Sequence, residues 1–150
     1  MDFIIRSIGI IHSPFTEKSQ TPIQPTYSQT SGWLEVFLDF ADGLDDIEGF
    51  SHLILLYGFH QSAGYSLHVK PFLDDHLHGV FATRHPCRPN PIGLSIVRLL
   101  GRRGNILDIV EMDILDGTPL LDIKPYVPDF DLRAGARTGW YETCTRRRGG

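Results

Sequence analysis

Short runs of β-branched, aliphatic and aromatic residues restrict the fold of this 150-residue chain more than any other feature. They are bounded by glycine, proline and polar segments, a pattern typical of β-strands. The runs with this pattern are residues 3–11, 32–40, 50–60, 65–72, 79–83, 92–100 and 105–115. Residues 50–60 are almost continuously apolar, which indicates a strand buried on both faces.

Helical signals are scarce. Residues 42–49 fit one short helix with acidic residues suited to its N-terminus, and residues 101–104 predict a β-hairpin turn between their flanking runs. We therefore expect a mostly-β protein with a small closed β-barrel, one or two short helices and a single domain, because closure removes the exposed sheet edges. We expect the barrel over residues 1–128 and a loosely held basic tail over residues 129–150, where apolar anchors are few.

Cysteine content and hydropathy exclude several classes of protein. The two cysteines, Cys87 and Cys144, are too few for a disulfide scaffold, and their spacing matches no metal motif. The first residues lack the features of a secretory signal peptide, and no segment is long and apolar enough to span a bilayer. These features predict a cytoplasmic protein with free thiols and no membrane association.

Charge is distributed unevenly along the chain. The formal net charge of −4 argues against a nucleic-acid partner. However, residues 1–75 carry ten acidic and three basic side chains, whereas residues 76–150 carry eight acidic and eleven basic ones. A local basic surface can attract a polyanion even when the total charge is negative. A solvated basic face without a partner is the alternative, and the charge pattern leaves both open.

Residues 79–95, GVFATRHPCRPNPIGLS, combine rigid and cationic residues. Their prolines restrict the backbone to extended conformations. The segment presents Arg84 and Arg88, whose planar guanidinium groups suit bidentate binding of a carboxylate or phosphate. A structural corner in which the arginines pair with nearby acids is an equally good interpretation.

Residues 113–126, DILDGTPLLDIKPY, place three acids in an apolar context. Because Asp113, Asp116 and Asp122 need partners there, they are candidates for binding the amine or hydroxyl groups of a ligand. The alternative is an ordinary β-turn over residues 116–119 with surface acids.

Other candidate groups are more isolated. His60 and Gln61 follow the most apolar run, at a strand end where binding sites are often built, although a structural histidine is the alternative. His76 and His78 can share one face of a strand, but no third ligand is in view and we expect no metal. Cys87 has no adjacent acid or amide that would complete a nucleophilic site. The sequence contains no glycine-rich dinucleotide motif and no P-loop.

Five segments resemble, in order and spacing, the TsaA-like family, also called TrmO, of tRNA methyltransferases. The resemblance extends over residues 5–128, and RPNPIG and DGTPLLDIKPY are its most specific motifs. The segments are IGIIHSPF (8–15), PIQP (22–25), GFSHLILLYGFHQ (49–61), GVFATRHPCRPNPIGLS (79–95) and LDGTPLLDIKPYVP (115–128).

This resemblance implies a small β-barrel that binds S-adenosylmethionine and works as a homodimer. It implies methyl transfer to the exocyclic nitrogen of threonylcarbamoyladenosine, next to the anticodon in the anticodon loop of tRNA. Many bacterial members have arginine where this chain has Ile23, so only a backbone or apolar contact carries over there. The cofactor-binding residues implied by the motifs are Pro22, Ile23, Gln24, His60, Gln61, Arg84, Leu94, Asp113, Ile114, Leu115 and Asp116.

The chemistry of the cofactor suggests roles for these residues. Asp113 or Asp116 can accept hydrogen bonds from its amine or ribose, and Arg84 can bind its carboxylate. Leu94 and Ile114 can face the adenine. Methyl transfer needs an in-line approach of about 3–3.5 Å, so positioning supplies much of the acceleration.

The acceptor nitrogen must also lose a proton. The candidate catalytic bases are His60, Asp116 and Tyr126, and the absence of any dedicated base is the alternative. The acceptor lies in a single-stranded loop, where proteins commonly splay and stack RNA bases. We expect phosphate contacts from Arg88, Lys124, Arg133 and Arg137.

Two other functions stay open at this point. A methyltransferase that acts on a small metabolite would fit the acidic net charge, and many bacterial members continue into a tRNA-contacting domain where this sequence has TRRRGG. A non-catalytic module that binds the cofactor or RNA would fit the lack of one identified base.

Overall fold

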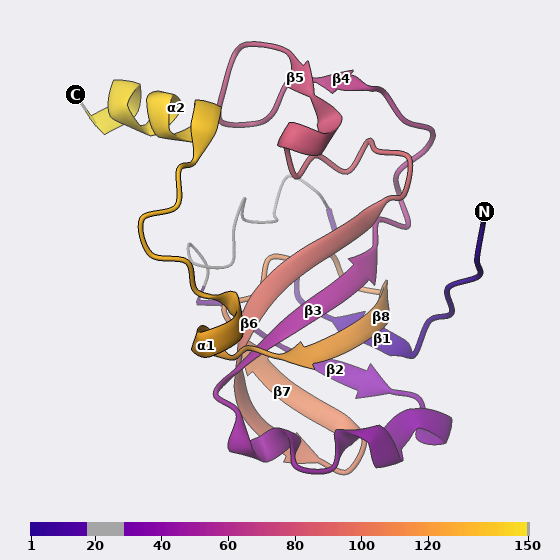
Figure 1. The fold of residues 1–150 in the computed structure, drawn as a ribbon. Coiled ribbons are helices and arrows are strands. Elements are labelled where there is room, and N and C mark those ends of the chain that lie inside the picture. Colours follow the sequence, from indigo (N-terminus) through magenta and orange to yellow (C-terminus); the bar gives the residue numbers. More distant parts are fainter. Residues whose placement is uncertain (18–28, 150) are drawn as a thin grey trace. The chain divides into compact units, whose positions relative to one another are not determined.

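The computed structural model describes residues 1–17 and 29–149 (Figure 1). The chain divides into two compact units, each made of two segments. Unit 1 comprises Met1–Gln61 and Ile92–Tyr126, and unit 2 comprises Ser62–Pro91 and Val127–Gly150.

Six strands of unit 1 form a closed barrel in the order β1-β2-β7-β6-β3-β8 (Figure 1). All neighbouring strands are antiparallel, so the ring has no unpaired sheet edge. The prediction of a mostly-β protein built on a closed barrel is confirmed. The strands are β1 (Gly9–His12), β2 (Ser31–Val36), β3 (His52–Gly58), β6 (Ile92–Arg103), β7 (Ile106–Val110) and β8 (Thr118–Pro125).

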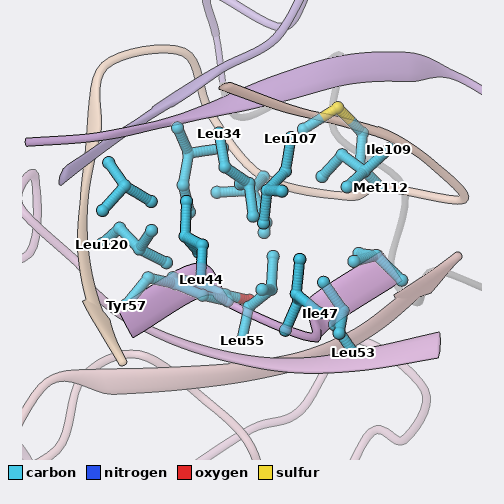
Figure 2. Close-up of a cluster of buried hydrophobic side chains, with 14 residues drawn as sticks. Leu34, Leu44, Ile47, Leu53, Leu55, Tyr57, Leu107, Ile109, Met112 and Leu120 are labelled. Atoms are coloured by element: carbon cyan, nitrogen blue, oxygen red, sulfur yellow. The ribbon is translucent and has the colours of Figure 1, made fainter. Parts of the chain in front are cut away.

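Each of the six strands contributes side chains to one apolar core (Figure 2). Burial alternates along β3, where Leu53, Leu55 and Tyr57 point inward and their neighbours are half-buried. The expectation of a strand fully buried on both faces is therefore wrong in this respect, because only one face of a barrel strand reaches the core. Leu44 and Ile47 close the core from outside the strands.

The connection from β7 to β8, residues 111–117, crosses one end of the barrel. These two strands stand opposite each other in the six-strand ring. Met112 and Ile114 of this crossing segment are buried in the core, at 0% and 2% exposure. Gly32 leaves room for this arrangement, since a Cβ atom there would collide with the sulfur of Met112. The crossing segment thus plugs the barrel end with alternate side chains.

Several expected elements differ in extent. Residues 3–8 are not a strand, and β1 begins only at Gly9. Strand β8 was not expected, because its two prolines and its acid obscure the alternation of buried residues. The hairpin between β6 and β7 is confirmed, with Gly104 in the left-handed region at φ 63°.

The expected helix over residues 42–49 is replaced by two 3-10 helices, η3 (Leu38–Leu44) and η4 (Ile47–Gly49). Asp46 separates them with a left-handed φ of 71°, which interrupts any continuous helix. Leu44 and Ile47 are their buried residues.

Unit 2 has much less regular structure. Its strands β4 (His68–Val69) and β5 (His78–Gly79) pair with each other, so the runs 65–72 and 79–83 give only short strands. The other elements of this unit are η5 (Val80–Ala82), α1 (Pro128–Asp131) and α2 (Gly139–Gly149).

Helix α2 lies where the sequence predicted a loosely held tail. Trp140 donates its indole N–H to the carbonyl of Ala82 at 2.8 Å and stacks on the ring of His78 at 4.8 Å. Cys144 is buried, with its thiol directed at the carbonyl of Leu73. The domain boundary at residue 128 stays a prediction, but the start of this helix packs within unit 2.

Candidate functional site

One end of the barrel brings together most of the described site residues of unit 1. Strand β3 ends beside the start of β6, where Gly58 pairs with Ile92, and β1 ends beside the start of β8, where Ile11 pairs with Thr118. The crossing segment 111–117 passes over this same end. We call this region the barrel mouth; its candidate residues are His60, Gln61, Leu94, Asp113, Ile114, Leu115 and Asp116.

Ser13 anchors the crossing segment to β1. Its hydroxyl donates to the carbonyl of Ile114 at 2.6 Å, and its backbone N–H donates to Oδ1 of Asp116 at 2.9 Å. The N–H of Asp116 in turn donates to the carbonyl of Phe15 at 2.7 Å. The carboxylate of Asp116 therefore has a structural partner and still keeps 44% of its side-chain surface exposed.

Residues 115–118 form the predicted turn, one residue earlier than expected. The N–H and the hydroxyl of Thr118 both donate to the carbonyl of Leu115, at 3.3 and 2.6 Å. Gly117 has φ 80°, a conformation that strongly favours glycine. The turn and the ligand-site interpretations of this motif are thus compatible, because the turn holds the acid at the mouth.

Asp113 is tied to the barrel interior. Its Oδ1 accepts a hydrogen bond of 2.7 Å from the hydroxyl of Ser95, which also lies 2.8 Å from the hydroxyl of Tyr57. Asp113 is half-buried between the buried residues Met112 and Ile114. Its carboxylate consequently has a fixed position at the mouth.

A cluster beside Asp116 was not expected from the sequence. His12 stacks on Trp33 with ring centroids 4.9 Å apart, and its Nε2 lies 3.3 Å from Oε1 of Glu35. Its Nδ1 lies 3.9 Å from Oδ1 of Asp116. When protonated, His12 would therefore stand between two carboxylates at this end of β1.

The remaining mouth residues differ in exposure and in the direction of their side chains. His60 and Gln61 are exposed just after β3. Leu94 is 42% exposed and points away from the core, since its neighbour Ser95 points inward. Ile114 is buried, at 2% exposure, and its carbonyl accepts the hydrogen bond from Ser13, which differs from the expected contact with adenine.

Tyr126 does not join these residues in unit 1. It follows the far end of β8, an eight-residue strand that spans about 25 Å at ordinary strand rise. There its N–H donates to the carbonyl of His52 at 3.0 Å. Within one chain, Tyr126, one of the three alternative bases, is therefore far from Asp116.

Lys124 lies toward the same far end of β8. Its Nζ is 2.9 Å from Oδ2 of Asp122, and this hydrogen bond and charge raise the pKa of the lysine. Both side chains are largely exposed, so the pair is readily separated by a competing phosphate.

The arginines of residues 79–95 have different surroundings within unit 2. Arg88 donates from Nη1 to the carbonyls of Thr83 and His85, at 2.9 and 3.1 Å, so it holds the loop together. Arg84 is exposed and makes no hydrogen bond or ion pair with any residue in the described ranges. The structural-corner interpretation thus fits Arg88, with carbonyls in place of acids, whereas Arg84 is available to a ligand.

Two of the acidic and histidine-rich residues 74–78 form a hydrogen-bonded pair. His78 Nε2 lies 2.7 Å from Oδ2 of Asp74, and both side chains are mostly buried. This hydrogen bond is the main cause that lowers the pKa of Asp74. Across residues 1–17 and 29–149, no three potential ligands come together to hold a metal ion.

Some predicted residues cannot be placed. Pro22, Ile23 and Gln24 lie outside the described residues. Arg133 and Arg137 are exposed in unit 2, where Arg133 donates to the carbonyl of Leu132 at 2.9 Å. In the described part of the chain, no helix has the length and apolar character required to cross a membrane.

Residues 10–132 match the family model described as the tRNA-methyltransferase O N-terminal domain. The chain belongs to this family. A TrmO crystal structure superposes with a TM-score of 0.81 at 44% identity, covering 93% of this chain and 64% of that one. The chain thus spans less than two thirds of that TrmO structure.

Curated relatives carry two kinds of name. A probable S-adenosyl-L-methionine-binding protein of Pyrococcus abyssi is 59% identical over 138 residues, which cover 91% of this chain and 75% of that protein. The tRNA (adenine(37)-N6)-methyltransferase of Escherichia coli is 40% identical, over 84% of this chain and 58% of that enzyme. The expected TrmO membership, on which the sequence analysis relied, is therefore confirmed.

Sequence reasoning missed the residues that hold the mouth in place. Ser13 and His12 lie in the IGIIHSPF segment, which marked the family without suggesting a role for either residue. Ser95 and Tyr57 occupy positions that the strand pattern treats as core. For both, the available signal was a hydroxyl at an inward-facing strand position, because a buried hydroxyl needs a partner.

Proposed function

We propose that this protein is an S-adenosylmethionine-dependent methyltransferase that acts on tRNA. Its acceptor is the exocyclic nitrogen of the adenosine next to the anticodon, in its threonylcarbamoylated form. The E. coli and rat relatives named tRNA (adenine(37)-N6)-methyltransferase support this proposal, as does the cofactor-binding name of the P. abyssi relative.

The observation that carries the proposal is the crossing segment. It presents Asp113 and Asp116 at the barrel mouth, fixed by Ser95 and Ser13. The cofactor offers an amine and two ribose hydroxyls, all of which donate hydrogen bonds, and carboxylates accept them strongly. A rigid pair of carboxylates therefore suits this ligand, and its sulfonium charge is compatible with the acidic surroundings.

Other groups complete the proposed cofactor site. Arg84 binds the cofactor carboxylate with its exposed guanidinium, and Leu94 offers an exposed apolar contact to the adenine. His60 and Gln61 lie at the end of β3, and Pro22, Ile23 and Gln24 contribute by backbone or apolar contact. Leu115 contributes from the turn, and the buried Ile114 supports the mouth from below. The site acts mainly by aligning the methyl group with the acceptor nitrogen.

Proton removal from the acceptor falls to His60 or Asp116. Both are exposed at the barrel mouth, so a water or an RNA group can reach them. Asp116 already accepts a hydrogen bond from the N–H of Ser13, which orients its carboxylate at the mouth. No dedicated base is required if the proton passes directly to solvent.

The proposed RNA contacts come from cationic side chains of both units. Arg88, Lys124, Arg133 and Arg137 are the candidates for phosphate binding. Arg88 has only one of its guanidinium nitrogens engaged in the hydrogen bonds described above, so its other N–H groups can still bind a phosphate. The proposed tRNA substrate fits the cytoplasmic location expected from the sequence.

We further propose a homodimer. On the outer face of the barrel, Ile96 of β6 is 37% exposed and pairs with the half-buried Ile54 of β3. A second copy can cover this apolar surface. Sedimentation of the purified chain should give twice the monomer mass, and Ile96→Asp should return the monomer. A monomer at all concentrations would contradict this part.

The test of the activity is methyl transfer to defined tRNA. Purified protein, isotope-labelled S-adenosylmethionine and tRNA from cells lacking this modification should yield labelled methyl-threonylcarbamoyladenosine in nucleoside mass spectrometry. Asp116→Ala and Arg84→Ala should abolish it, whereas Asp39→Ala, an exposed acid outside the mouth, should not. Labelling that survives ribonuclease treatment of a cell extract would point to a small acceptor and contradict the tRNA assignment. Cofactor binding without transfer to any tRNA pool would contradict catalysis.

A further inference from the structure

Two buried hydroxyl groups form a chain that leads to the carboxylate of Asp113. Tyr57 Oη lies 2.8 Å from Ser95 Oγ, and Ser95 Oγ donates to Asp113 Oδ1 at 2.7 Å. Tyr57 and Ser95 are only 6% and 1% exposed. Phenylalanine and alanine would fill almost the same space in this apolar core, so packing alone does not account for the hydroxyls.

The direction of the hydrogen bonds follows from the number of hydrogens. A serine hydroxyl has a single hydrogen to donate, and that of Ser95 goes to the carboxylate. The hydrogen between Tyr57 and Ser95 must therefore come from Tyr57. Both O–H dipoles point toward Asp113, and hydrogen bonds aligned in this way strengthen one another in a low-dielectric interior.

Packing fixes both ends of this chain. Gly93 is the cross-strand partner of Tyr57, and a Cβ atom there would collide with the tyrosine ring. Phe59 meets the same ring edge to face, with centroids 5.7 Å apart. At the other end, the buried neighbours Met112 and Ile114 hold the backbone of Asp113. The chain therefore connects two rigid points.

We propose that Tyr57 and Ser95 are positioning residues that orient the Asp113 carboxylate toward the bound cofactor, an inference that rests on the proposed function. Neither hydroxyl touches the cofactor. A carboxylate can accept several hydrogen bonds through its two oxygens, so the bond from Ser95 leaves capacity for the amine or a ribose hydroxyl. Tyr57 acts through Ser95, and Ser95 acts through Asp113.

Calorimetric titration of S-adenosylmethionine into matched variants tests this order. Ser95→Ala should weaken binding about 10-fold, the scale of one hydrogen bond to a charged group. Tyr57→Phe, which keeps the packed ring, should weaken it about 3-fold. The double variant should bind no more weakly than Ser95→Ala, because residues acting in series are not additive. In an Asp113→Asn background, neither change should have a further effect.

A control separates positioning from stability. Val97→Ala removes a buried inward-facing side chain from the same strand without touching the hydroxyl chain, so it should lower the unfolding midpoint and leave cofactor affinity unchanged. Unchanged affinity in Ser95→Ala and Tyr57→Phe, with loss in Asp113→Asn, would overturn the positioning role and leave the proposed function standing. Additive losses would overturn the serial order. Failure of the wild-type protein to bind the cofactor would overturn both proposals.

Discussion

The two units of this chain are stabilised by different kinds of interaction. Unit 1 closes six strands around a core that each of them fills. Unit 2 has two-residue strands and few buried apolar side chains, and individual contacts such as Arg88 to two carbonyls and Trp140 to Ala82 hold it together. The barrel depends on collective packing, whereas unit 2 depends on single side chains.

The units also differ in charge. Unit 1 contains thirteen acidic and six basic side chains, and unit 2 contains five acidic and eight basic ones. The acidic unit holds the carboxylates that suit a cationic cofactor, and the basic unit suits a polyanion. Because the two units have opposite charge balances, the net charge of −4 does not indicate whether such a chain binds RNA.

Each unit carries one of the two tryptophans, Trp33 in unit 1 and Trp140 in unit 2. The variants Trp140→Phe and Trp33→Phe therefore let fluorescence follow one unit at a time. The stability predictions below can be measured in these backgrounds by urea unfolding.

The largest effect is expected in the barrel core. Leu55→Ala creates a cavity at a fully buried position and should lower the free energy of unfolding by about 2–5 kcal/mol. Leu77→Ala in unit 2 is the matched control, because that side chain is 67% exposed and should cost less than about 0.5 kcal/mol. Similar losses of unfolding free energy in both variants would contradict the contrast between the packed barrel and unit 2.

Close strand packing gives the next effect. A Cβ atom at Gly9 would collide with the carbonyl oxygen of Glu35, so Gly9→Ala should cost about 1–3 kcal/mol. Gly101→Ala is the control, since Gly101 is also a strand glycine but has open space around its Cβ position. Unfolding curves that coincide for the two variants would contradict the tight pairing of β1 with β2.

Arg84 and Arg88 of unit 2 are predicted to have separate roles, in ligand binding and in loop structure. Arg88→Met removes the hydrogen bonds to Thr83 and His85 and should cost unit 2 about 1 kcal/mol, with the Trp140 signal as the measurement. Arg84→Met should leave that signal unchanged and instead weaken S-adenosylmethionine binding in calorimetry. The reverse pattern would show that the structural and ligand-binding roles have been exchanged.

The smallest effect is a pH dependence confined to unit 2. The hydrogen bond from His78 lowers the pKa of Asp74 below its ordinary value of 3.8. A depressed carboxylate pKa adds stability above the unfolded-state pKa, and this stability is lost as the pH falls through the folded-state value. Asp74→Asn should therefore unfold more easily than wild type at neutral pH, with a difference that shrinks below about pH 4. A difference that persists unchanged in strong acid would contradict this origin.

The same contrast explains what the sequence could predict. Apolar runs bounded by turn residues recur along the sequence, β2, β3 and β6 among them, so the barrel could be inferred from many residues at once. The alternation of buried residues along β3 is seen only in the structure, because its sequence is almost continuously apolar. Helix α2 and the contacts of Trp140 have no periodic signal, since its few apolar residues do not form a stripe. Strand β8 could not be predicted, because its two prolines and Asp122 are residue types typical of loops.

The candidate site was predictable only in part. Asp113 and Asp116 were identified because acids in an apolar context need partners. Their placement at the mouth depends on the crossing of residues 111–117 over the barrel, which no local pattern encodes. Burial of Ile114 and the distance of Tyr126 from Asp116 follow from strand order and length, which only the assembled barrel provides.

The most direct test of the central claim is a crystal structure of the protein with S-adenosylhomocysteine bound. The account predicts that Asp113 or Asp116 accepts hydrogen bonds from the amine or ribose of the ligand, and that Arg84 binds its carboxylate. A ligand bound away from the barrel mouth, with none of these three side chains in contact, would contradict it.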